Sequence, residues 1–402
     1  MDIAIIGGGA AGMMAAAFIA EQNTQATITL IEQNQLLGRK VRMTGGGRCN
    51  LTTGLSPIDE ILRRYPRGQR FLKHALYDFP PAKVIEWFEG HGVPLKTEPD
   101  LRVFPQSDRS DDIVSVFEII YQKFGVRVLF NTAAQNVTVK DGKFIITAKN
   151  NIINADRLLI SAGGRTSHIV NSYEIAKSLG HSVTDLAPSL CSFIANESWV
   201  RELSGVSFKG VNLSLNDYKF KGSFVFTHKG ITGPAIFAIS ALSAHEVINP
   251  EKPANLYIDL IPETNEEMLL SELQKAIIEN RKKNFLNVLA QFTPKSVADI
   301  ICRINGIMKE KMCAEISKKE LNKAAHSLKS FNLTIIGRSA GEEFVTAGGV
   351  NLEEVDPKTM QSKICPGLFF AGEILDVDAF TGGFNLQAAW ATGRLAGINM
   401  LK

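Results

Sequence analysis

A glycine-rich turn near the start of the chain constrains the fold more than any other segment. Residues 2–6 are apolar enough for a short buried strand, residues 7–12 read G-x-G-x-x-G, and residues 13–20 continue as an apolar helix. A second expected strand, residues 27–31, ends at Glu32. In this order, the turn presents the free N–H groups and positive dipole end of a helix to a phosphate. The segment therefore predicts a β-α-β unit that binds a dinucleotide, with Glu32 accepting hydrogen bonds from ribose hydroxyls.

Three glycines of the turn have separate roles in this interpretation. Gly7 permits the tight turn, Gly9 lets a pyrophosphate approach the backbone, and Gly12 lets the helix pack closely on the strand. A membrane span is a competing interpretation, because the uncharged stretch 3–20 approaches the length of about twenty residues that a span needs. Four glycines interrupt it and no basic segment precedes it, so neither a span nor a signal peptide is favoured. On this segment alone, an ordinary glycine-rich turn of an α/β protein remains an alternative interpretation.

Composition and charge exclude several classes of protein. The chain has 402 residues, 45% hydrophobic and 21% charged, which predicts two or three globular domains and excludes a disordered or fibrous protein. The net charge of +3, from 44 basic and 41 acidic residues, does not favour nucleic acid or an anionic membrane as a partner. Five cysteines without a C-x-x-C pair favour a reducing cytoplasm. Seven histidines without the spacing of metal ligands predict no metal site.

A second glycine-rich loop follows the β-α-β unit. Residues 38–50 contain three adjacent glycines, 45–47, flanked by Arg39, Lys40 and Arg48. Consecutive glycines allow positive φ angles and a close approach of backbone to a flat or charged ligand. The interleaved basic residues fit a flexible linker poorly, so the sequence predicts a ligand loop.

The order of patterns along the chain predicts an inserted region. Up to residue 188, expected helices and strands alternate, including a hairpin about Asp141-Gly142. Residues 190–262 then carry short β-like runs separated by turns. Residues 265–330 switch to a helical period and include the capping box Ser317-x-x-Glu320. Glycine-rich α/β character resumes after this block, which therefore looks inserted.

The C-terminal stretch restores ligand-type turns. An expected strand, residues 367–372, ends at Glu373, and Gly382-Gly383 opens a helix. The turn at residues 383–386, Gly-Phe-Asn-Leu, would direct the N–H groups of that helix at a bound group. A plain capped helix does not need such a turn, so a ligand-binding role is favoured.

Taken together, these motifs resemble those of the two-dinucleotide-binding-domain flavoproteins. Within them, the chain resembles the BaiN/YhiN family of FAD/NAD(P)-dependent oxidoreductases. The segments that carry the resemblance stand in family order over nearly the whole chain. They are GGGAAG at 7–12, GRKVRMTGGGRCN at 38–50, VFP at 103–105, FTHKGITGP at 226–234, VTAGGV at 345–350, FAGE at 370–373 and TGGFNLQ at 381–387.

The resemblance implies an α/β fold with an interrupted domain. A Rossmann-like FAD-binding domain would comprise residues 1–188 and 332–402. The region inserted into it would have a β-rich part, residues 189–262, and a helical part, residues 263–331.

The resemblance also implies which residues hold FAD. The opening turn would hold the pyrophosphate, Glu32 the adenosine ribose, the backbone of Val137 the adenine edge, and Glu373 the ribitol. The helix that starts near Gly383 would stabilise negative charge at the pyrimidine end of the reduced flavin and so tune its redox potential. The candidate cofactor-binding residues are Gly7, Gly9, Ala11, Gly12, Glu32, Arg39, Lys40, Gly47, Arg48, Cys49, Asn50, Val137, Gly372, Glu373, Gly383, Asn385 and Leu386.

Three functions are compatible with such a site. The first is a reductase, in which NAD(P)H delivers hydride to flavin N5 and the reduced flavin passes it to a small organic substrate such as the C=C bond of an enone. The sequence has no second G-x-G-x-x-G, so the nicotinamide would stack on the flavin only transiently. The second is an oxidase of a small amine, in which O₂ reoxidises the flavin and yields peroxide. The third, a flavin-bound sensor without catalysis, is the least favoured, since the motifs position a reactive flavin.

No catalytic side chain is assigned from the sequence. Arg48 lies beside Cys49 and would lower the pKa of its thiol, but no partner cysteine follows at disulfide-reductase spacing. A packing or flavin-contact role is therefore favoured for Cys49. His228 is a possible proton donor from the inserted region, although a structural or exposed histidine is the commoner case.

Overall fold

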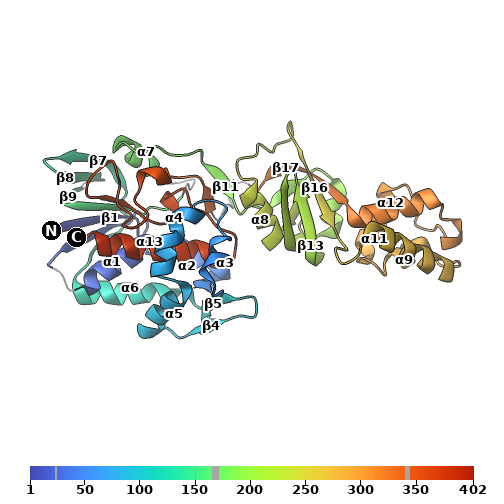
Figure 1. Cartoon of the computed structure of the whole chain (residues 1–402), viewed down its shortest axis with the longest axis horizontal. Helices are drawn as coiled ribbons and strands as arrows, with labels where there is room; N and C mark the ends of the chain where they lie inside the picture. The colour runs from blue at the N-terminus through green and yellow to red at the C-terminus, as the bar shows by residue number, and fades with distance from the viewer. Residues whose placement is uncertain (23–24, 150, 165–171, 340–344) are drawn as a thin grey trace. The chain divides into compact units, whose positions relative to one another are not determined.

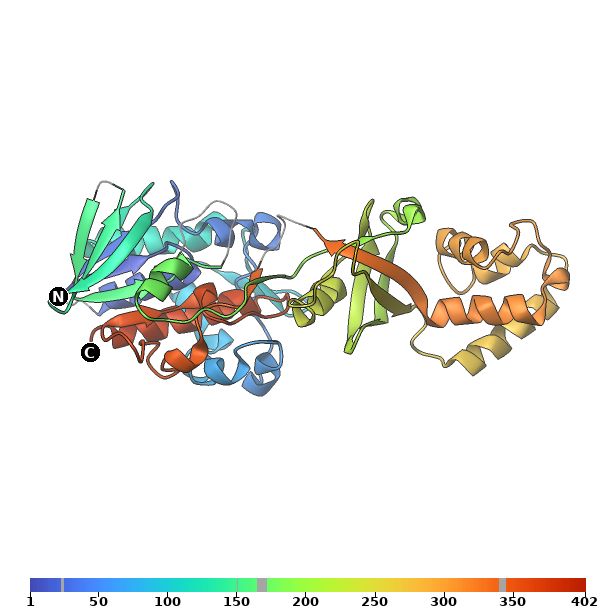
Figure 2. The ribbon, with the colours of Figure 1, turned by 90° about the horizontal axis from the view of Figure 1, so that it is seen from above.

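The computed structural model describes residues 1–22, 25–149, 151–164, 172–339 and 345–402. The chain forms two compact units (Figures 1 and 2). Unit 1 comprises Met1–Pro188 and Val345–Lys402, and unit 2 comprises Ser189–Phe344. Both ends of the chain, blue and red in Figure 1, therefore belong to unit 1. Each unit has its own cluster of buried apolar side chains, which gives each the core of a separate domain.

A five-stranded sheet forms the centre of unit 1, in the order β19–β10–β1–β2–β6, and every neighbouring pair is parallel. Strands buried on both faces read as continuous apolar runs, as the β1 sequence DIAII does. Since β19 comes from the end of the chain, the first and last segments build one sheet, and the predicted Rossmann-like α/β fold is confirmed. The strands are β1 (Asp2–Ile6), β2 (Thr27–Ile31), β6 (Arg127–Leu129), β10 (Arg157–Ile160) and β19 (Leu368–Phe370).

Helices from both chain ends pack together beside this sheet. Helix α1 (Ala10–Glu21) contacts α13 (Phe384–Asn399) and α6 (Ser110–Phe124). The approach of α1 to α13 requires glycine, because a Cβ at Gly393 would lie 2.3 Å from the carbonyl oxygen of Ala11. Glycine in α13 thus allows this helix to lie close to α1, which also places the turn that precedes α13.

Smaller elements complete unit 1. Two antiparallel three-stranded sheets have the orders β3–β5–β4 and β7–β8–β9, and the β7–β8 hairpin turns at Asp141-Gly142 as predicted. The remaining bounds are α2 (Arg39–Met43), η1 (Thr44–Gly47), β3 (Thr52–Thr53), α3 (Ile58–Leu62), α4 (Gln69–Asp78), α5 (Pro81–Gly90), β4 (Leu95–Thr97), β5 (Arg102–Pro105), β7 (Ala134–Lys140), β8 (Lys143–Ala148), β9 (Asn151–Ala155), α7 (Ser172–Ser178), β11 (Ala187–Ser189), β18 (Val345–Ala347), η4 (Leu352–Glu354) and η5 (Gly372–Ile374).

Unit 2 consists of a closed barrel and a group of helices, α9 to α12, that lies between the barrel strands β16 and β17 in the sequence. The barrel order is β12–β15–β14–β13–β16–β17, and helix α8 packs on β14. The capping box at Ser317 and Glu320 opens α12, as the sequence predicts. The bounds are β12 (Phe193–Ala195), η2 (Ser198–Leu203), β13 (Ser207–Leu215), β14 (Tyr218–Phe226), β15 (Gly230–Thr232), α8 (Pro234–Leu242), β16 (Ala254–Asp259), α9 (Glu266–Glu279), α10 (Phe285–Leu289), α11 (Lys295–Ile304), η3 (Cys313–Glu315), α12 (Lys318–Lys329) and β17 (Phe331–Arg338).

Strand β17 belongs to unit 2, whereas the expected domain boundary assigned residues from 332 onward to the FAD-binding domain. This strand pairs with β12 and β16 and closes the barrel, so unit 2 extends to Phe344. Its residues alternate between buried and exposed positions near its start, as a strand with one face on a core does. No helix in the described part of the chain is both long and apolar enough to cross a membrane.

Candidate cofactor site

The glycines of the opening turn differ in what surrounds them. A Cβ at Gly12 would lie 1.9 Å from the Gly7 carbonyl oxygen, and one at Gly7, where φ is +104°, would lie 2.6 Å from Ala162 Cα. Neither Gly7 nor Gly12 has room for a side chain, because the strand and the helix that the turn joins pack closely at these positions. A Cβ at Gly9 would have no atom within 4 Å among the described residues. Space is therefore open at Gly9, the N-cap of α1, where no described side chain caps the helix.

Glu32 is buried against the turn. Its Oε2 accepts a hydrogen bond from the N–H of Gly8 at 2.8 Å, and its Oε1 accepts from the N–H and Nδ2 of Asn34 at 2.7 and 2.6 Å. A carboxylate offers about four acceptor positions, so these donors leave one for a ligand. They also fix the direction of the side chain. Nothing in the spacing of the sequence pointed to Asn34.

The glycine loop presents an open face. Gly45, Gly46 and Gly47 have φ angles of +60°, +70° and +90°, which side chains rarely adopt. A Cβ at Gly45 would lie 2.7 Å from the Phe104 ring, whereas one at Gly46 or Gly47 would meet no described atom within 4 Å. The loop therefore rests on Phe104 through Gly45 and exposes its next two residues. Arg39, at the start of α2, is exposed as well.

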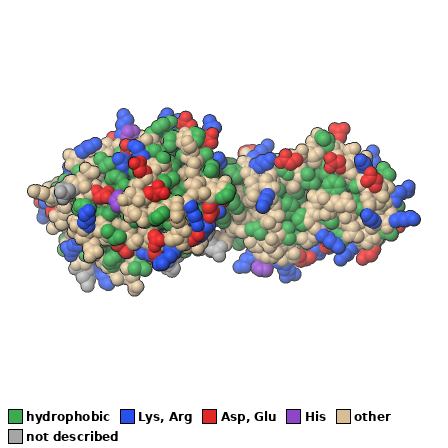
Figure 3. Space-filling model, turned by 90° about the horizontal axis from the view of Figure 1, so that it is seen from below, with side chains coloured by type: hydrophobic (Ala, Val, Ile, Leu, Met, Phe, Trp, Pro, Cys, Tyr) green, Lys and Arg blue, Asp and Glu red, His purple; other side chains and the backbone are tan. Residues whose placement is uncertain are grey.

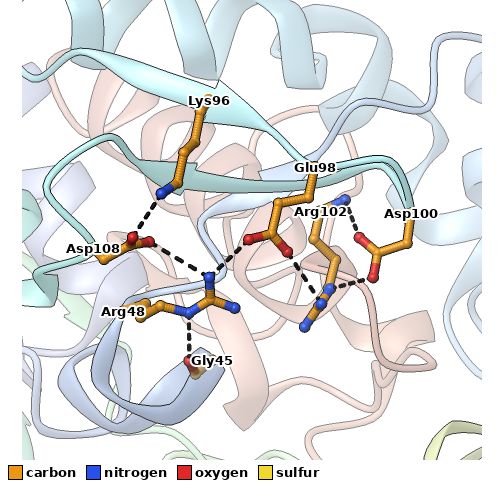
Figure 4. A network of polar contacts seen from close by, with 7 residues as sticks. All are labelled: Gly45, Arg48, Lys96, Glu98, Asp100, Arg102 and Asp108. Carbon is orange, nitrogen blue, oxygen red and sulfur yellow. Dashed lines mark hydrogen bonds and ion pairs between the residues drawn. The ribbon is translucent and has the colours of Figure 1, made fainter.

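The side chain of Arg48 contacts the β4–β5 hairpin (Figure 4). Its Nη1 lies 2.7 Å from Glu98 Oε1 and 3.5 Å from Asp108 Oδ1, and its guanidinium lies 3.9 Å from the centroid of the Phe104 ring. The hydrogen bond to Glu98 raises the pKa of Arg48 above its ordinary value, against the opposing effect of burial. Its charge is thus engaged by carboxylates of this hairpin region, which the sequence did not indicate.

The surroundings of Cys49 do not favour a reactive thiol. The side chain is fully buried, and burial raises the pKa of the thiol to about 12. The neighbouring Arg48 points at Glu98, so the expected lowering of the thiol pKa by that arginine is wrong. The residue instead shapes the loop, because its φ angle is +64° and its N–H donates to the Thr44 carbonyl oxygen at 3.0 Å.

Lys40 and Glu373 form an ion pair that joins two of the predicted cofactor segments. Lys40 Nζ lies 2.8 and 3.1 Å from the two carboxylate oxygens. Glu373 Oε1 also accepts from the N–H of Thr346 at 2.9 Å, and a Cβ at Gly164 would lie 2.5 Å from this oxygen. The carboxylate therefore lies where α2, the end of β10, β18 and η5 meet. The backbone of Gly372, just before it, has a φ angle of +76°.

The turn before α13 is held by two asparagines. In the amide orientation that satisfies both groups, Asn50 accepts from the Gly383 N–H at 3.0 Å and donates to the Thr52 carbonyl oxygen at 3.3 Å. The Asn385 amide bonds the N–H and carbonyl oxygen of Ala379, both at 2.9 Å. These side chains are used within the protein. What α13 offers a ligand is its backbone, since no described side chain caps its N-terminus.

Two buried polar atoms near Glu373 have no hydrogen-bond partner among the residues described. They are the Tyr173 hydroxyl and Asp376 Oδ1. Burial, and then the charges of Glu373 and Asp376, raise the pKa of Tyr173, so its hydroxyl keeps its proton. The other oxygen of Asp376 accepts from Thr184 Oγ1 at 3.1 Å. Buried polar atoms without partners are costly, and a bound polar group would relieve that cost.

Other predicted residues have different surroundings. Ala11 is buried where α1 meets Gly372 and α13. Val137 lies in β7, opposite Ile146 of β8, with its side chain buried. Leu386 is half-buried in the first turn of α13. His228 lies in unit 2, in an exposed turn between β14 and β15.

The residues present fit an ADP-containing flavin cofactor. The open space at Gly9 and at Gly46–Gly47, the uncapped N-termini of α1 and α13, and the unpartnered atoms near Glu373 all belong to unit 1. Residues 1–399 match the family described as "HI0933-like protein Rossmann domain". The chain belongs to this family. It is a flavin-dependent oxidoreductase, and the resemblance to the BaiN/YhiN family is confirmed.

Two named relatives align with almost the whole chain. A 3-dehydro-bile acid delta(4,6)-reductase of Clostridium scindens is 28% identical over 98% of both chains. A ribosomal RNA dihydrouridine synthase of Haemophilus influenzae is 27% identical over 98% of this chain and 97% of its own. Among solved structures, the 3-ketosteroid-delta4-(5alpha)-dehydrogenase of Rhodococcus jostii covers 100% of this chain and 96% of its own, with a TM-score of 0.52 and 15% identity. That last likeness concerns the fold alone.

Proposed function

We propose that this protein is an FAD-dependent reductase that uses NAD(P)H to saturate a C=C bond conjugated to a carbonyl group. One observation carries the proposal. Full-length relatives named for a bile-acid reductase and for dihydrouridine synthesis match the chain equally well, at 28% and 27% identity. Both names describe the addition of two hydrogens to a C=C bond next to a carbonyl, so the shared reaction is a better inference than either substrate.

The proposed FAD site uses the surfaces of unit 1 that are open or unpartnered. The pyrophosphate would lie at Gly9 and the N-terminus of α1, where both the backbone N–H groups and the dipole favour an anion. Glu32 would bind the adenosine ribose, and Glu373, held by Lys40, would bind the ribitol. When bound, FAD supplies reversible two-electron chemistry.

The remaining catalytic work falls to groups of the chain itself. The N–H groups that open α13 would stabilise negative charge at the pyrimidine edge of the cofactor. The Tyr173 hydroxyl, like that of an ordinary tyrosine, is protonated at neutral pH and would donate a hydrogen bond to a polar group bound beside Glu373. Burial raises the pKa of the Cys49 thiol, so we assign this residue no part in electron transfer.

An anaerobic titration tests the reductase. The yellow holoenzyme is mixed with NADH or NADPH in the absence of O₂, and the flavin absorbance is followed. We expect one of the two to bleach the flavin, and an enone such as a 4,6-dien-3-one steroid to restore the colour. If neither nucleotide bleaches it and an amine does so instead, the reductase proposal is wrong and the amine oxidase is favoured.

Uridine in ribosomal RNA is a second candidate substrate, and the Haemophilus relative is the observation that favours it. The distribution of surface charge gives less support to an RNA substrate. On the face of the molecule in Figure 3, Lys and Arg side chains are interspersed with Asp and Glu, whereas an RNA-binding face is usually a continuous basic patch. An RNA transcript tested in place of the steroid separates the two candidates, because reoxidation of the reduced flavin by the transcript, with formation of dihydrouridine, would identify RNA as the substrate.

A further inference from the structure

We propose that Glu98 is a positioning residue for the flavin loop, defined here as residues 44–50. Through Arg48 it would hold Gly46 and Gly47 in the conformation that receives the cofactor. The inference rests on the proposed FAD site. It assigns a role to a residue that lies outside every motif of the sequence.

The flavin loop needs restraint from outside itself. Gly45, Gly46, Gly47 and Cys49 all have positive φ angles, between +60° and +90°. Glycine loses more conformational freedom on folding than any other residue, so a run of three samples many conformations when it is not held. A ligand that binds against such a run must then meet the entropic cost of ordering it.

Arg48 is the long side chain through which the loop reaches the β4–β5 hairpin. Its guanidinium stacks on Phe104 while Glu98 binds its edge at 2.7 Å, as Figure 4 shows for the polar contacts. The same Phe104 ring lies where a Cβ at Gly45 would be 2.7 Å away, so the ring supports both the loop backbone and the arginine. Arg48 Nε also faces the Gly45 carbonyl oxygen at 3.4 Å. A fixed guanidinium would therefore restrain Gly45 directly, and Gly46 and Gly47 through their position between Gly45 and Arg48.

Glu98 is the central carboxylate of this network. Its Oε1 accepts from Arg48, and its Oε2 accepts from Arg102 at 3.1 Å. Asp108 is the weaker partner of Arg48, at 3.5 Å, and is itself held by Lys96 at 2.6 Å. The hydrogen bond from Lys96 lowers the pKa of Asp108, although burial opposes the shift. Glu98 thus sets the direction of Arg48, with Asp108 in support.

Asp100 provides a matched control within the same hairpin. Its carboxylate accepts from Arg102 at 2.7 Å from Nε and 3.2 Å from the backbone N–H, and it makes no contact with Arg48. The Asp100→Asn substitution removes a charge of the same sign from the same network. It leaves the Glu98–Arg48 pair intact, so general electrostatic or folding effects can be separated from loop positioning.

The test compares Glu98→Gln with Asp100→Asn in the full-length protein. FAD is removed, then titrated back, and the dissociation constant, the flavin midpoint potential and the apoprotein melting temperature are measured. The pair is partly exposed, so we expect Glu98→Gln to raise the FAD dissociation constant by about threefold to fivefold and to shift the midpoint potential. Asp100→Asn should leave both unchanged, with a similar melting temperature.

A second variant tests the same contact if Glu98→Gln folds poorly. Arg48→Lys keeps the charge but loses the flat, forked guanidinium, and it should reproduce the Glu98→Gln effect. Combining the two substitutions should add nothing further, because both act on one contact. Wild-type FAD affinity and potential in both single variants, or an equal loss in Asp100→Asn, would overturn the role of Glu98. A wild-type protein that binds no FAD would instead overturn the proposed function, and the inference with it.

Discussion

At the scale of single residues, Tyr173 separates stability from function. Its buried hydroxyl has no partner in the described parts of the chain, and an unmet buried donor costs about 1–3 kcal/mol. We therefore expect the Tyr173→Phe apoprotein to be as stable as the wild type, or more stable by up to about 1 kcal/mol. We expect its FAD affinity or turnover to fall, since the hydroxyl is proposed to meet a bound group. Chemical denaturation of the apoprotein and steady-state kinetics of the holoenzyme measure the two effects. A less stable apoprotein would contradict this assignment.

At a second residue, His181, we expect burial to make the stability of unit 1 depend on pH. Its Nε2 lies 2.8 Å from the Ser362 hydroxyl, which itself accepts two backbone N–H groups and so donates to the imidazole. Nδ1 lies 3.2 Å from Glu354 Oε2, close enough for an ion pair when the imidazole is protonated. Burial lowers the pKa of His181 below its ordinary value of 6.5, despite the opposing charge of Glu354.

The sign of the pH effect follows from this shift. Below about pH 6.5 the unfolded chain binds a proton at this histidine that the folded chain binds less readily, so stability is full above that pH and is lost as the pH falls, by at most about 1.4 kcal/mol per pH unit. We expect the free energy of unfolding to fall between pH 7 and pH 5 in the wild type, and to fall less steeply in His181→Gln. Urea denaturation at a series of pH values measures both slopes. Equal slopes in the two proteins would show that another group is responsible.

At the scale of elements, the strand–turn–helix offers a matched pair of glycine substitutions. Gly12→Ala would place a methyl group 1.9 Å from the Gly7 carbonyl oxygen, so we expect a loss of stability of at least about 2 kcal/mol. Gly9→Ala meets no described atom within 4 Å, so the apoprotein should stay stable. The new methyl group would occupy the proposed pyrophosphate position. We therefore expect FAD affinity to fall about tenfold, which corresponds to a loss of about 1.4 kcal/mol in binding free energy. Thermal unfolding without FAD and FAD titration test the pair. Wild-type affinity in Gly9→Ala would place the pyrophosphate elsewhere.

The elements that could be predicted from the sequence are those whose sequence signals lie close together in the chain. The β1–α1–β2 unit, the β7–β8 hairpin and the capping box of α12 follow from patterns within about thirty residues, because turn and cap chemistry is local. Contacts between distant segments could not be predicted in this way. The Arg48–Glu98 pair spans 50 residues and the Lys40–Glu373 pair spans 333, and nothing local to either residue selects its partner. For the same reason, β17 had no local signal that it closes a barrel with β12.

At the scale of the whole molecule, the two points where the chain passes between the units are neighbours within each unit. Strands β11 and β18, where the chain leaves and re-enters unit 1, are hydrogen-bonded neighbours, and the adjoining Val183–Val350 bridge is antiparallel. In unit 2, Phe193 pairs with Arg338 at the two ends of the barrel sequence. An insertion with adjacent ends interrupts its host at one place only, and such insertions are well tolerated.

Replacing residues 190–344 with a linker of about four residues, a common length for a hairpin loop, should therefore give a folded unit 1. Every group of the proposed FAD site lies in residues 1–188 and 345–402, so we expect the shortened protein to unfold cooperatively and to bind FAD within about threefold of the full chain, a difference of less than 1 kcal/mol. Turnover of the shortened protein with an enone shows whether unit 2 contributes to catalysis. Calorimetry, FAD titration and the enone assay measure the three properties. A variant that folds yet cannot retain FAD would show that unit 2 is part of the cofactor site, and the proposed site would then have to be extended to that unit.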